Sequence, residues 1–354
     1  MMLEGIRVLD FTQNLPGPYA TLRLADMGAE VIKVEPPTGD PACHLAGGLV
    51  YETNNRNKKS IMVDLKKDEN VQALYKLIKS IDVIIESFRP GVMKRIGLDY
   101  ETLKGKKEDI VYCSLSGFGQ SGEYAHLGSH DLNYQALSGL LSQYVDDQND
   151  PVHPTITTAD YTGGLVASER ISSALFHRER TGKGSYLDVA LNDTFQAMLT
   201  SHAGYQIESN KKDGPPFLEG SVVCYHLYRT KDDRFMSLAA LEPQFWMNFC
   251  KGVNKENWEA LAFETIDSNV YREMKALFRE GTMKDWEIFG QKHDCCLFPV
   301  LTIEEVLGHS YGETRGLFTK SEEKLIVSTY QNAPAFQAIV HKQFQQLIKE
   351  CDET

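Results

Sequence analysis

The sequence lacks the apolar runs that secretion or membrane insertion requires. The N-terminus, Met-Met-Leu-Glu-Gly-Ile-Arg, has no apolar signal core, and no run of about 18 apolar residues occurs in the chain. The C-terminus, Glu-Cys-Asp-Glu-Thr, is not a peroxisomal address of the Ser-Lys-Leu kind. We therefore expect a cytoplasmic protein that neither spans nor binds a membrane.

Patterned cysteines and an excess of positive charge are also missing. The seven cysteines are scattered apart from Cys295-Cys296, which favours reduced thiols, and no His, Cys and Asp set has metal-binding spacing. We therefore predict no metal site. A net charge of -12 argues against general nucleic-acid binding, although an anionic ligand can still occupy a local basic pocket.

The first third of the chain alternates between strand and helix patterns. Residues 6–11 form an apolar strand, 12–18 a Pro/Gly loop, 19–27 a helical segment and 30–34 a second strand. This β-α-β unit aims a helix N-terminus at the strand ends, where phosphate groups commonly bind, but it lacks the GxGxxG motif of nicotinamide-binding folds. Further strands at 60–65, 83–86 and 110–116, with helices at 70–80 and 92–96, predict an α/β fold with a doubly wound, mostly parallel sheet.

The remaining chain predicts a second, smaller domain. Helices at 131–145, 160–178 and 192–207 and a strand at 187–189 continue the first domain, and a linker follows at 211–216. Strands at 222–228 and 235–238 flank a polar turn, which indicates a hairpin, and helical segments run to about 290. An apolar piece at 298–301, a helix at 303–309 and an amphipathic helix at 333–349 complete the chain. We expect a large Rossmann-like domain at 1–205 and 300–354, and a small α+β domain at 210–295.

Two segments carry the candidate chemistry. Gly128-Ser-His-Asp-Leu-Asn-Tyr134 offers the imidazole of His130, and Ala159-Asp-Tyr-Thr-Gly-Gly164 offers the carboxylate of Asp160 at the start of a helix. An imidazole and a carboxylate on opposite sides of a carbon can remove a proton from one face and return one to the other, as a racemase does. An aspartate acting without the histidine suits a nucleophile in acyl transfer. We interpret Asp131 as a helix N-cap, and the glycines after Asp160 as room for a substrate to approach the backbone.

Several motifs in the same order resemble a known family. The segments are Leu3-Glu-Gly-Ile-Arg-Val-Leu-Asp-Phe11, Leu15-Pro-Gly-Pro18, Met27-Gly-Ala-Glu-Val-Ile-Lys-Val-Glu-Pro36, Asn55-Arg-Asn-Lys-Lys-Ser60, Phe88-Arg-Pro-Gly91 and Thr181-Gly-Lys-Gly184. They are similar to the family III CoA-transferases, the CaiB/BaiF superfamily, and most resemble its 2-methylacyl-CoA racemases. The resemblance covers essentially the whole chain. It implies an acyl-CoA thioester substrate, no separate cofactor because coenzyme A is part of the substrate, and a homodimer of two interlocked chains.

The resemblance also implies roles for the candidate residues. The segment around His130 is similar to the racemase motif that carries the catalytic histidine, with Ser129 where glycine is more usual. Ala240-Leu-Glu-Pro-Gln-Phe245 is similar to the segment whose glutamate, here Glu242, supports that histidine; an ordinary glutamate at a helix start is the alternative. Asp160 matches a carboxylate that is the base in racemases and the acyl-accepting nucleophile in transferases.

The resemblance implies further residues for coenzyme A. Arg95 stands at the position that the family uses near the ligand, and Pro36-Pro37 replaces an arginine that related racemases can have near the phosphates. A basic cluster near the strand ends is a further candidate for the phosphates, and it comprises Lys33, Arg56, Lys58 and Lys59. The residues expected to flank the adenine are Leu65, Ser87, Phe88 and Ile96.

The leading hypothesis from the sequence is a cofactor-independent racemase of 2-methylacyl-CoA thioesters, in which His130 and Asp160 exchange the α-proton through an enolate. The alternative is a CoA-transferase that forms an acyl-enzyme at Asp160. A non-catalytic acyl-CoA-binding protein is a third hypothesis, and the combination of His130, Asp160 and Glu242 argues against it. The sequence does not identify the acyl chain.

Overall fold

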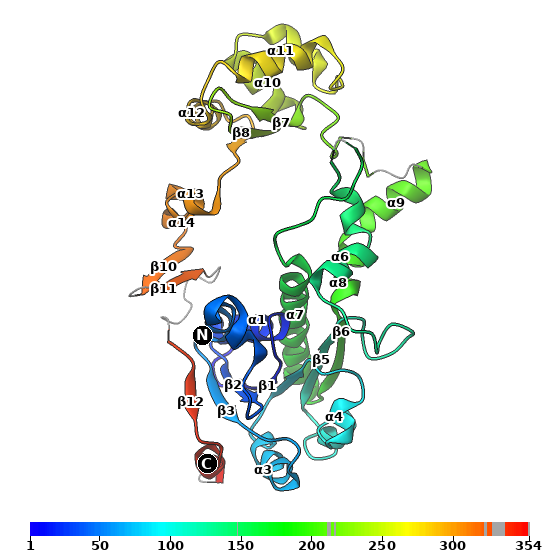
Figure 1. Cartoon of the computed structure of the whole chain (residues 1–354), viewed down its shortest axis with the longest axis vertical. Helices are drawn as coiled ribbons and strands as arrows, with labels where there is room; N and C mark the ends of the chain where they lie inside the picture. The colour runs from blue at the N-terminus through cyan, green and yellow to red at the C-terminus, as the bar shows by residue number, and fades with distance from the viewer. Residues whose placement is uncertain (147, 211–213, 216, 322–323, 328–336, 353–354) are drawn as a thin grey trace. The chain divides into compact units, whose positions relative to one another are not determined.

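The computed structural model describes the chain except residues 147, 211–213, 216, 322–323, 328–336 and 353–354 (Figure 1). The described chain divides into two compact units. The first comprises Met1–Leu199 with Arg315–Thr354, and the second comprises Thr200–Thr314. The chain therefore leaves the first unit, builds the second and returns, and the second unit takes in residues on both sides of the predicted 210–295. Part of the predicted linker, 211–213 and 216, lies outside the described residues.

A seven-stranded parallel sheet forms the centre of the first unit (Figure 1), which confirms the predicted α/β fold class. The strand order is β12-β3-β2-β1-β4-β5-β6. The strands are β1 (Arg7–Phe11), β2 (Glu30–Glu35), β3 (Lys59–Met62), β4 (Val83–Glu86), β5 (Val111–Ser116), β6 (Ser185–Ala190) and β12 (Val340–Lys342). The chain order reverses between neighbouring β1 and β4, so this pair is the switch point where ligands of such folds bind, beyond the carboxyl ends of the strands.

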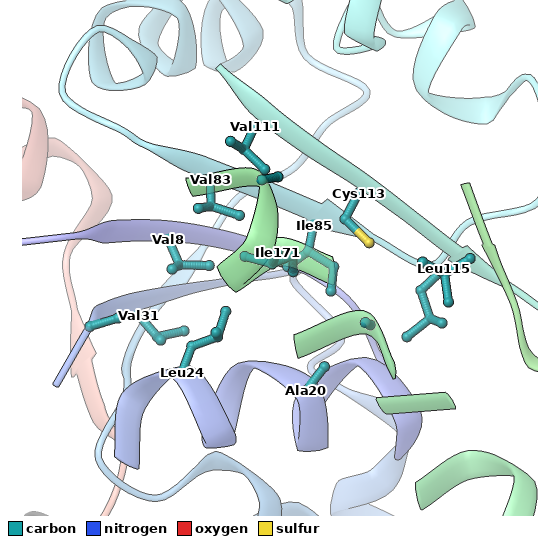
Figure 2. Close-up of a cluster of buried hydrophobic side chains, with 14 of the residues drawn as sticks. Val8, Ala20, Leu24, Val31, Val83, Ile85, Val111, Cys113, Leu115 and Ile171 are labelled. Carbon is teal, nitrogen blue, oxygen red and sulfur yellow. The ribbon is translucent and has the colours of Figure 1, made fainter. Parts of the chain in front are cut away.

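One face of the sheet packs against α1 (Pro16–Asp26) and α7 (Thr158–Thr181). Figure 2 shows Ala20 and Leu24 of α1 and Ile171 of α7 close to the strand residues Val8 and Val83. Because side chains alternate along a strand, every second residue of β4 and β5 enters this apolar layer, and β1 contributes Val8. Burial of these aliphatic side chains fixes α7, and with it Asp160 in its first turn, against the sheet.

The opposite face packs against α3 (Asp68–Ile78) and α15 (Phe344–Asp352). The sequence pattern placed one helix over 333–349, and this is wrong for residues 340–342, which form β12. Val340 pairs in parallel with Lys59 of β3, and α15 begins only at Phe344; residues 333–336 lie outside the described residues. The edge of β3 gains a hydrogen-bonded partner in this way, and the short apolar pattern alone did not reveal it.

Shorter helices connect the strands of the first unit. They are η1 (Pro41–Gly48), α2 (Leu49–Asn55), α4 (Val92–Arg95), α5 (Tyr100–Lys104), α6 (Asp131–Leu137), η2 (Leu140–Gln143) and α8 (Leu191–Met198). The predicted helix at 131–145 is divided into α6 and η2, because Gly139 between them takes a left-handed conformation with φ 91°. This unit also includes an antiparallel pair of strands, β10 (Phe318–Ser321) and β11 (Lys324–Val327), that the sequence did not predict.

The second unit is built on a three-stranded antiparallel sheet of β7 (Tyr225–Arg229), β8 (Phe235–Ala239) and β9 (Leu297–Pro299). The predicted hairpin is confirmed, although β7 begins at Tyr225. Aromatic side chains dominate the core, with the ring of Phe278 stacked on Tyr228 at a centroid distance of 4.5 Å. The helical elements are α9 (Thr200–Ser209), α10 (Pro243–Gly252), η3 (Glu256–Leu261), α11 (Asn269–Phe278), α12 (Met283–His293), α13 (Ile303–Leu307) and α14 (Ser310–Thr314). Across the described parts of both units, no helix combines the length and apolarity needed to cross a bilayer.

Candidate functional site

The loops at the carboxyl ends of β1 and β4 meet at the switch point of the sheet. The backbone N–H of Gln13, after β1, donates a hydrogen bond of 3.2 Å to Oγ of Ser87, after β4. The chain that follows β5 continues through a glycine-containing loop to His130 and α6. The two candidate bases therefore belong to connections and helices that extend from one edge of the parallel sheet.

His130 is the residue immediately before α6, and its backbone is extended, with φ -134° and ψ 174°. Its backbone N–H donates to Oδ1 of Asn133 at 3.0 Å, which fixes the peptide at the helix start, while the imidazole remains exposed. The preceding loop is attached to α6 by a hydrogen bond of 2.8 Å, which Oγ of Ser129 donates to the phenol oxygen of Tyr134. The histidine is thus presented to solvent from a backbone that is itself fixed.

Asp160 lies in the first turn of α7 and is partly buried. Loss of water around the carboxyl, reinforced by the negative charge of nearby Asp131, raises the pKa of Asp160 to about 7. At neutral pH this carboxyl exists in both protonated and ionised forms. A carboxyl in that state can accept a proton in one step and donate it in another.

Asp131 joins the two candidate bases. Its side chain is buried, and its Oδ2 accepts a hydrogen bond of 2.9 Å from the backbone N–H of Asp160, while its Oδ1 accepts one from the amide of Gln135. The expectation that Asp131 caps its own helix is wrong, because His130 occupies the N-cap of α6. The carboxylate instead satisfies a free N–H at the start of α7.

The two glycines after Asp160 have a different role from the expected one. A Cβ on Gly163 would lie 2.1 Å from Cδ2 of Leu191, and a Cβ on Gly164 would lie 2.7 Å from the carbonyl oxygen of Pro16. Their missing side chains therefore allow α7 to pack closely against α8 and α1. The space beside them is filled by the protein itself, so the interpretation that they admit a substrate is wrong.

The residues predicted to flank adenine lie near the loop after β4 and on the α3 side of the sheet. Leu65, Phe88 and Ile96 are partly buried and pack against the apolar layer there, and Ser87 holds the β1 loop as described. Arg95 ends α4 and is exposed, so its guanidinium is open to a ligand. The roles of these residues in binding coenzyme A stay predictions.

The basic cluster predicted for the phosphates is largely internal. Nζ of Lys33 is fully buried, 2.8 Å from Oδ2 of Asp40, and it also donates to the carbonyl oxygen of Thr12. Arg56 is buried and donates two hydrogen bonds of 2.6 Å to the carboxylate of Asp26. The charges of Lys33 and Arg56 are therefore both paired inside the protein. A contact of either residue with coenzyme A stays a prediction.

Lys58 is also internal and anchors the start of α1. Its Nζ donates to the carbonyl oxygen of Pro18, to Oγ1 of Thr21 and to Oδ1 of Asn55, each at 2.8 Å. Burial lowers the pKa of Lys58 to about 7, although Asp10 at 3.5 Å opposes that shift. Asp10 in turn accepts from Oγ1 of Thr21 at 2.5 Å. This buried polar network holds the loop after β1 in place.

Glu242 belongs to the second unit. It is exposed and occupies the N-cap position of α10, with an extended backbone at φ -75° and ψ 135°. This position agrees with the alternative of a glutamate at a helix start, and its support of His130 stays a prediction.

Sequence reasoning missed the Asp131–Asp160 contact and the aromatic pair beside it. Tyr161 packs edge-on against Tyr19 of α1, with ring centroids 4.8 Å apart. Asp131 and Gln135 stand four residues apart on a helix, a spacing at which side chains interact, and that was the available signal. Nothing in the linear sequence relates this pair to the backbone of a residue in α7.

Comparison with known proteins gives one consistent result. The pattern that defines CoA-transferase family III matches residues 3–345. Human alpha-methylacyl-CoA racemase is 36% identical over 334 residues, which cover 92% of this chain and 84% of that protein. Human succinyl-CoA:glutarate CoA-transferase is 36% identical over 279 residues, covering 76% of this chain and 62% of that protein.

Solved structures resemble the whole chain. A CAIB/BAIF family protein from Brucella suis has a TM-score of 0.82 at 25% identity, with 99% of this chain and 98% of that chain covered. A Mycobacterium tuberculosis protein has a TM-score of 0.84 at 24% identity, covering 97% of each chain, and this likeness concerns the fold.

Proposed function

The chain belongs to CoA-transferase family III, and we propose that it is a cofactor-independent racemase of 2-methylacyl-CoA thioesters. The observation that carries the proposal is the state of Asp160, whose pKa is raised to about 7. The backbone N–H of Asp160 donates a hydrogen bond to the carboxylate of Asp131, the residue that directly follows His130. A carboxyl with a pKa near neutrality and an imidazole are thus supplied by adjoining helix starts.

The proposed reaction moves one proton off C2 and another onto it. In one direction the ionised carboxylate of Asp160 takes the α-proton, and the C–H electron pair moves into an enolate with its charge on the thioester oxygen. The imidazolium of His130 then donates its proton to the opposite face of C2, which regenerates the thioester with inverted configuration. In the other direction His130 is the base and Asp160 the acid, so no proton or electron is gained or lost overall.

We propose that the substrate's coenzyme A portion lies along the loop after β4. The exposed Arg95 supplies a cation there, and Phe88 and Ile96 supply apolar surface. Under this proposal Glu242 supports His130, two chains assemble as an interlocked homodimer, and no cofactor besides the substrate's own coenzyme A takes part.

A CoA-transferase with an acyl-enzyme at Asp160 is the second candidate, and the similarity to succinyl-CoA:glutarate CoA-transferase favours it. A nucleophilic carboxylate must be ionised, and a pKa of about 7 leaves a substantial protonated fraction of Asp160 at neutral pH. That property suits proton exchange better than nucleophilic attack.

The test is incubation of the purified protein with a chiral 2-methylacyl-CoA in D₂O, without a second acid, read by mass spectrometry and NMR. We expect deuterium at C2 together with loss of optical purity. His130→Ala and Asp160→Asn should each abolish racemisation. His126→Ala is the matched control, because His126 is an exposed histidine four residues earlier and should leave the rate unchanged.

Three outcomes would contradict the proposal. Absence of exchange in the wild-type protein over several acyl-chain lengths would reject racemisation. Transfer of coenzyme A to added carboxylates, with an acyl or CoA adduct trapped on Asp160, would establish the second candidate. Racemisation at the wild-type rate in His130→Ala would remove His130 from the mechanism.

A further inference from the structure

We propose that Asp131 is a positioning residue for this reaction, whose carboxylate holds the first turn of α7 against the start of α6. The inference rests on the proposed function, because positioning matters only if His130 and Asp160 act on one substrate. Asp131 directly follows the candidate base His130. The sequence predicted only that its side chain caps its own helix.

The contact is built from two sides. Asp131 is 7% exposed and accepts a hydrogen bond from the backbone N–H of Asp160 at 2.9 Å. Gln135, one turn further along α6, is 1% exposed, and its amide donates to Asp131 and also to the carbonyl oxygen of Ile156 at 3.4 Å. The segment from Ile156 to Asp160 is therefore held by two neighbouring side chains of α6.

This arrangement fixes the distance between His130 and Asp160 through a short connection. His130 is attached to Asp131 by one peptide bond, and Asp131 reaches the backbone of Asp160 by one hydrogen bond. A displacement of α7 relative to α6 would break that bond and leave a buried carboxylate without its N–H donor, which is costly. The hydrogen bond between Asp131 and Asp160 therefore resists changes in the distance between the two bases, and the substrate carbon must fit between them.

The same carboxylate acts electrostatically on Asp160. Burial is the first cause of the raised pKa of Asp160, and the charge of Asp131 on α6 is the second. The other titratable groups that interact with Asp160 are phenols, Tyr134 from α6 and Tyr161 from α7, whose pKa values are raised by burial and, to a smaller extent, by Asp160. Within the described chain, no cation contributes to the pKa shift of Asp160.

Two substitutions separate the hydrogen bond from the charge. Asp131→Asn keeps an oxygen that accepts from the N–H of Asp160 and removes the charge, so the pKa of Asp160 should move down toward the ordinary aspartate range. For the direction of reaction in which Asp160 accepts the proton, the acid limb of the plot of racemisation rate against pH should also move to lower pH. Asp131→Ala removes both interactions and should lower kcat by about tenfold or more with a smaller change in KM, because small misplacements of reacting groups are costly.

The experiment measures both properties. Carboxyl-carbon NMR of protein with labelled aspartate, assigned with Asp160→Asn, gives the pKa of Asp160 in the wild type and in Asp131→Asn. The racemisation assay gives kcat and KM for wild type and both variants. Asp193→Asn is the control: it removes one negative charge from an exposed position on α8 and should change neither readout.

The inference is supported if the pKa of Asp160 falls in Asp131→Asn and kcat falls in Asp131→Ala, with both variants folded by circular dichroism. An unchanged pKa in Asp131→Asn overturns it, and so does a wild-type kcat in Asp131→Ala. Should Asp131→Ala fail to fold, the pKa and pH profile of Asp131→Asn decide. If the wild-type protein does not racemise any substrate, the proposed function fails, whereas the NMR titration still reports on the contact.

Discussion

Substitution of Gly164 by alanine tests the close packing that sets the position of α7. The added Cβ would lie 2.7 Å from the carbonyl oxygen of Pro16 and 2.9 Å from the ring of Tyr19. Ordinary contacts between carbon and carbonyl oxygen begin near about 3.3 Å, so the methyl group is roughly 0.6 Å too close to a backbone atom. The Pro16 carbonyl belongs to the first residue of α1, and relief requires one helix to move against the other.

Overpacking of this kind costs about 1–3 kcal/mol. For a unit of this size, each kcal/mol lowers the melting temperature by about 2–4 °C, so we expect a decrease between about 2 and 12 °C. Movement of α7 would also displace Asp160, so kcat for racemisation should fall. The assay is thermal unfolding followed by circular dichroism, combined with the D₂O exchange measurement.

Gly204→Ala is the matched control, because a Cβ on Gly204 in α9 meets no atom within 4 Å. Alanine in a helix is favoured over glycine by about 0.5–1 kcal/mol, so this variant should melt at the same temperature or higher. If Gly164→Ala keeps the wild-type melting temperature but raises KM, the packing argument is refuted and the glycine serves substrate approach after all.

Three further predictions concern single groups. Asp160→Asn should stabilise the fold by at most about 4 kcal/mol near pH 8, as measured by urea unfolding. The folded-state pKa of Asp160 is raised to about 7, so the wild-type protein loses stability as pH rises from about 4 through 7, and the uncharged asparagine avoids that loss. An equal gain in the free energy of unfolding at pH 4 would contradict this pH dependence. Arg56→Met should cost about 3–5 kcal/mol, since it removes both hydrogen bonds that the guanidinium donates to the buried carboxylate of Asp26, and Arg56→Met with Asp26→Asn should recover part of that loss in the same assay. Thr282→Ala should destabilise the second unit by about 1 kcal/mol, because Oγ1 of Thr282 accepts from the N–H of Asp285 at the start of α12; an unchanged unfolding curve would show that the cap contributes nothing.

The alternation of strands and helices was readable from the sequence because parallel sheets bury both faces and require helical crossovers. Strand β4 was predicted residue for residue and β1 and β2 to within one residue, whereas α1 begins at Pro16, three residues before the predicted helix. The terminal helix was predicted to start too early, since residues 340–342 are strand only because β3 offers an edge far away in the chain. Such a pairing is a tertiary property, and a short apolar pattern does not contain it.

The candidate site was predictable to the extent that its chemistry is local. His130 and Asp160 stand at helix starts that turn chemistry marks, and both of these positions were predicted. The internal pairing of Lys33 and Arg56 was not predictable, because residue type reveals a charge but not its partner, here Asp40 and Asp26. The role of Asp131 depends on the backbone of α7, so no spacing rule could supply it.

The pairing of β12 with β3 has a consequence for synthesis of the protein on the ribosome. Lys59 can pair with Val340 only after the whole of Thr200–Thr314 has been translated. Until then β3 is an unpaired edge of the sheet of the first unit. Open edges template pairing with other chains, and contacts so distant in sequence form slowly. A nascent chain halted before residue 340 should therefore depend on chaperones, even though every other strand of the sheet has already been made.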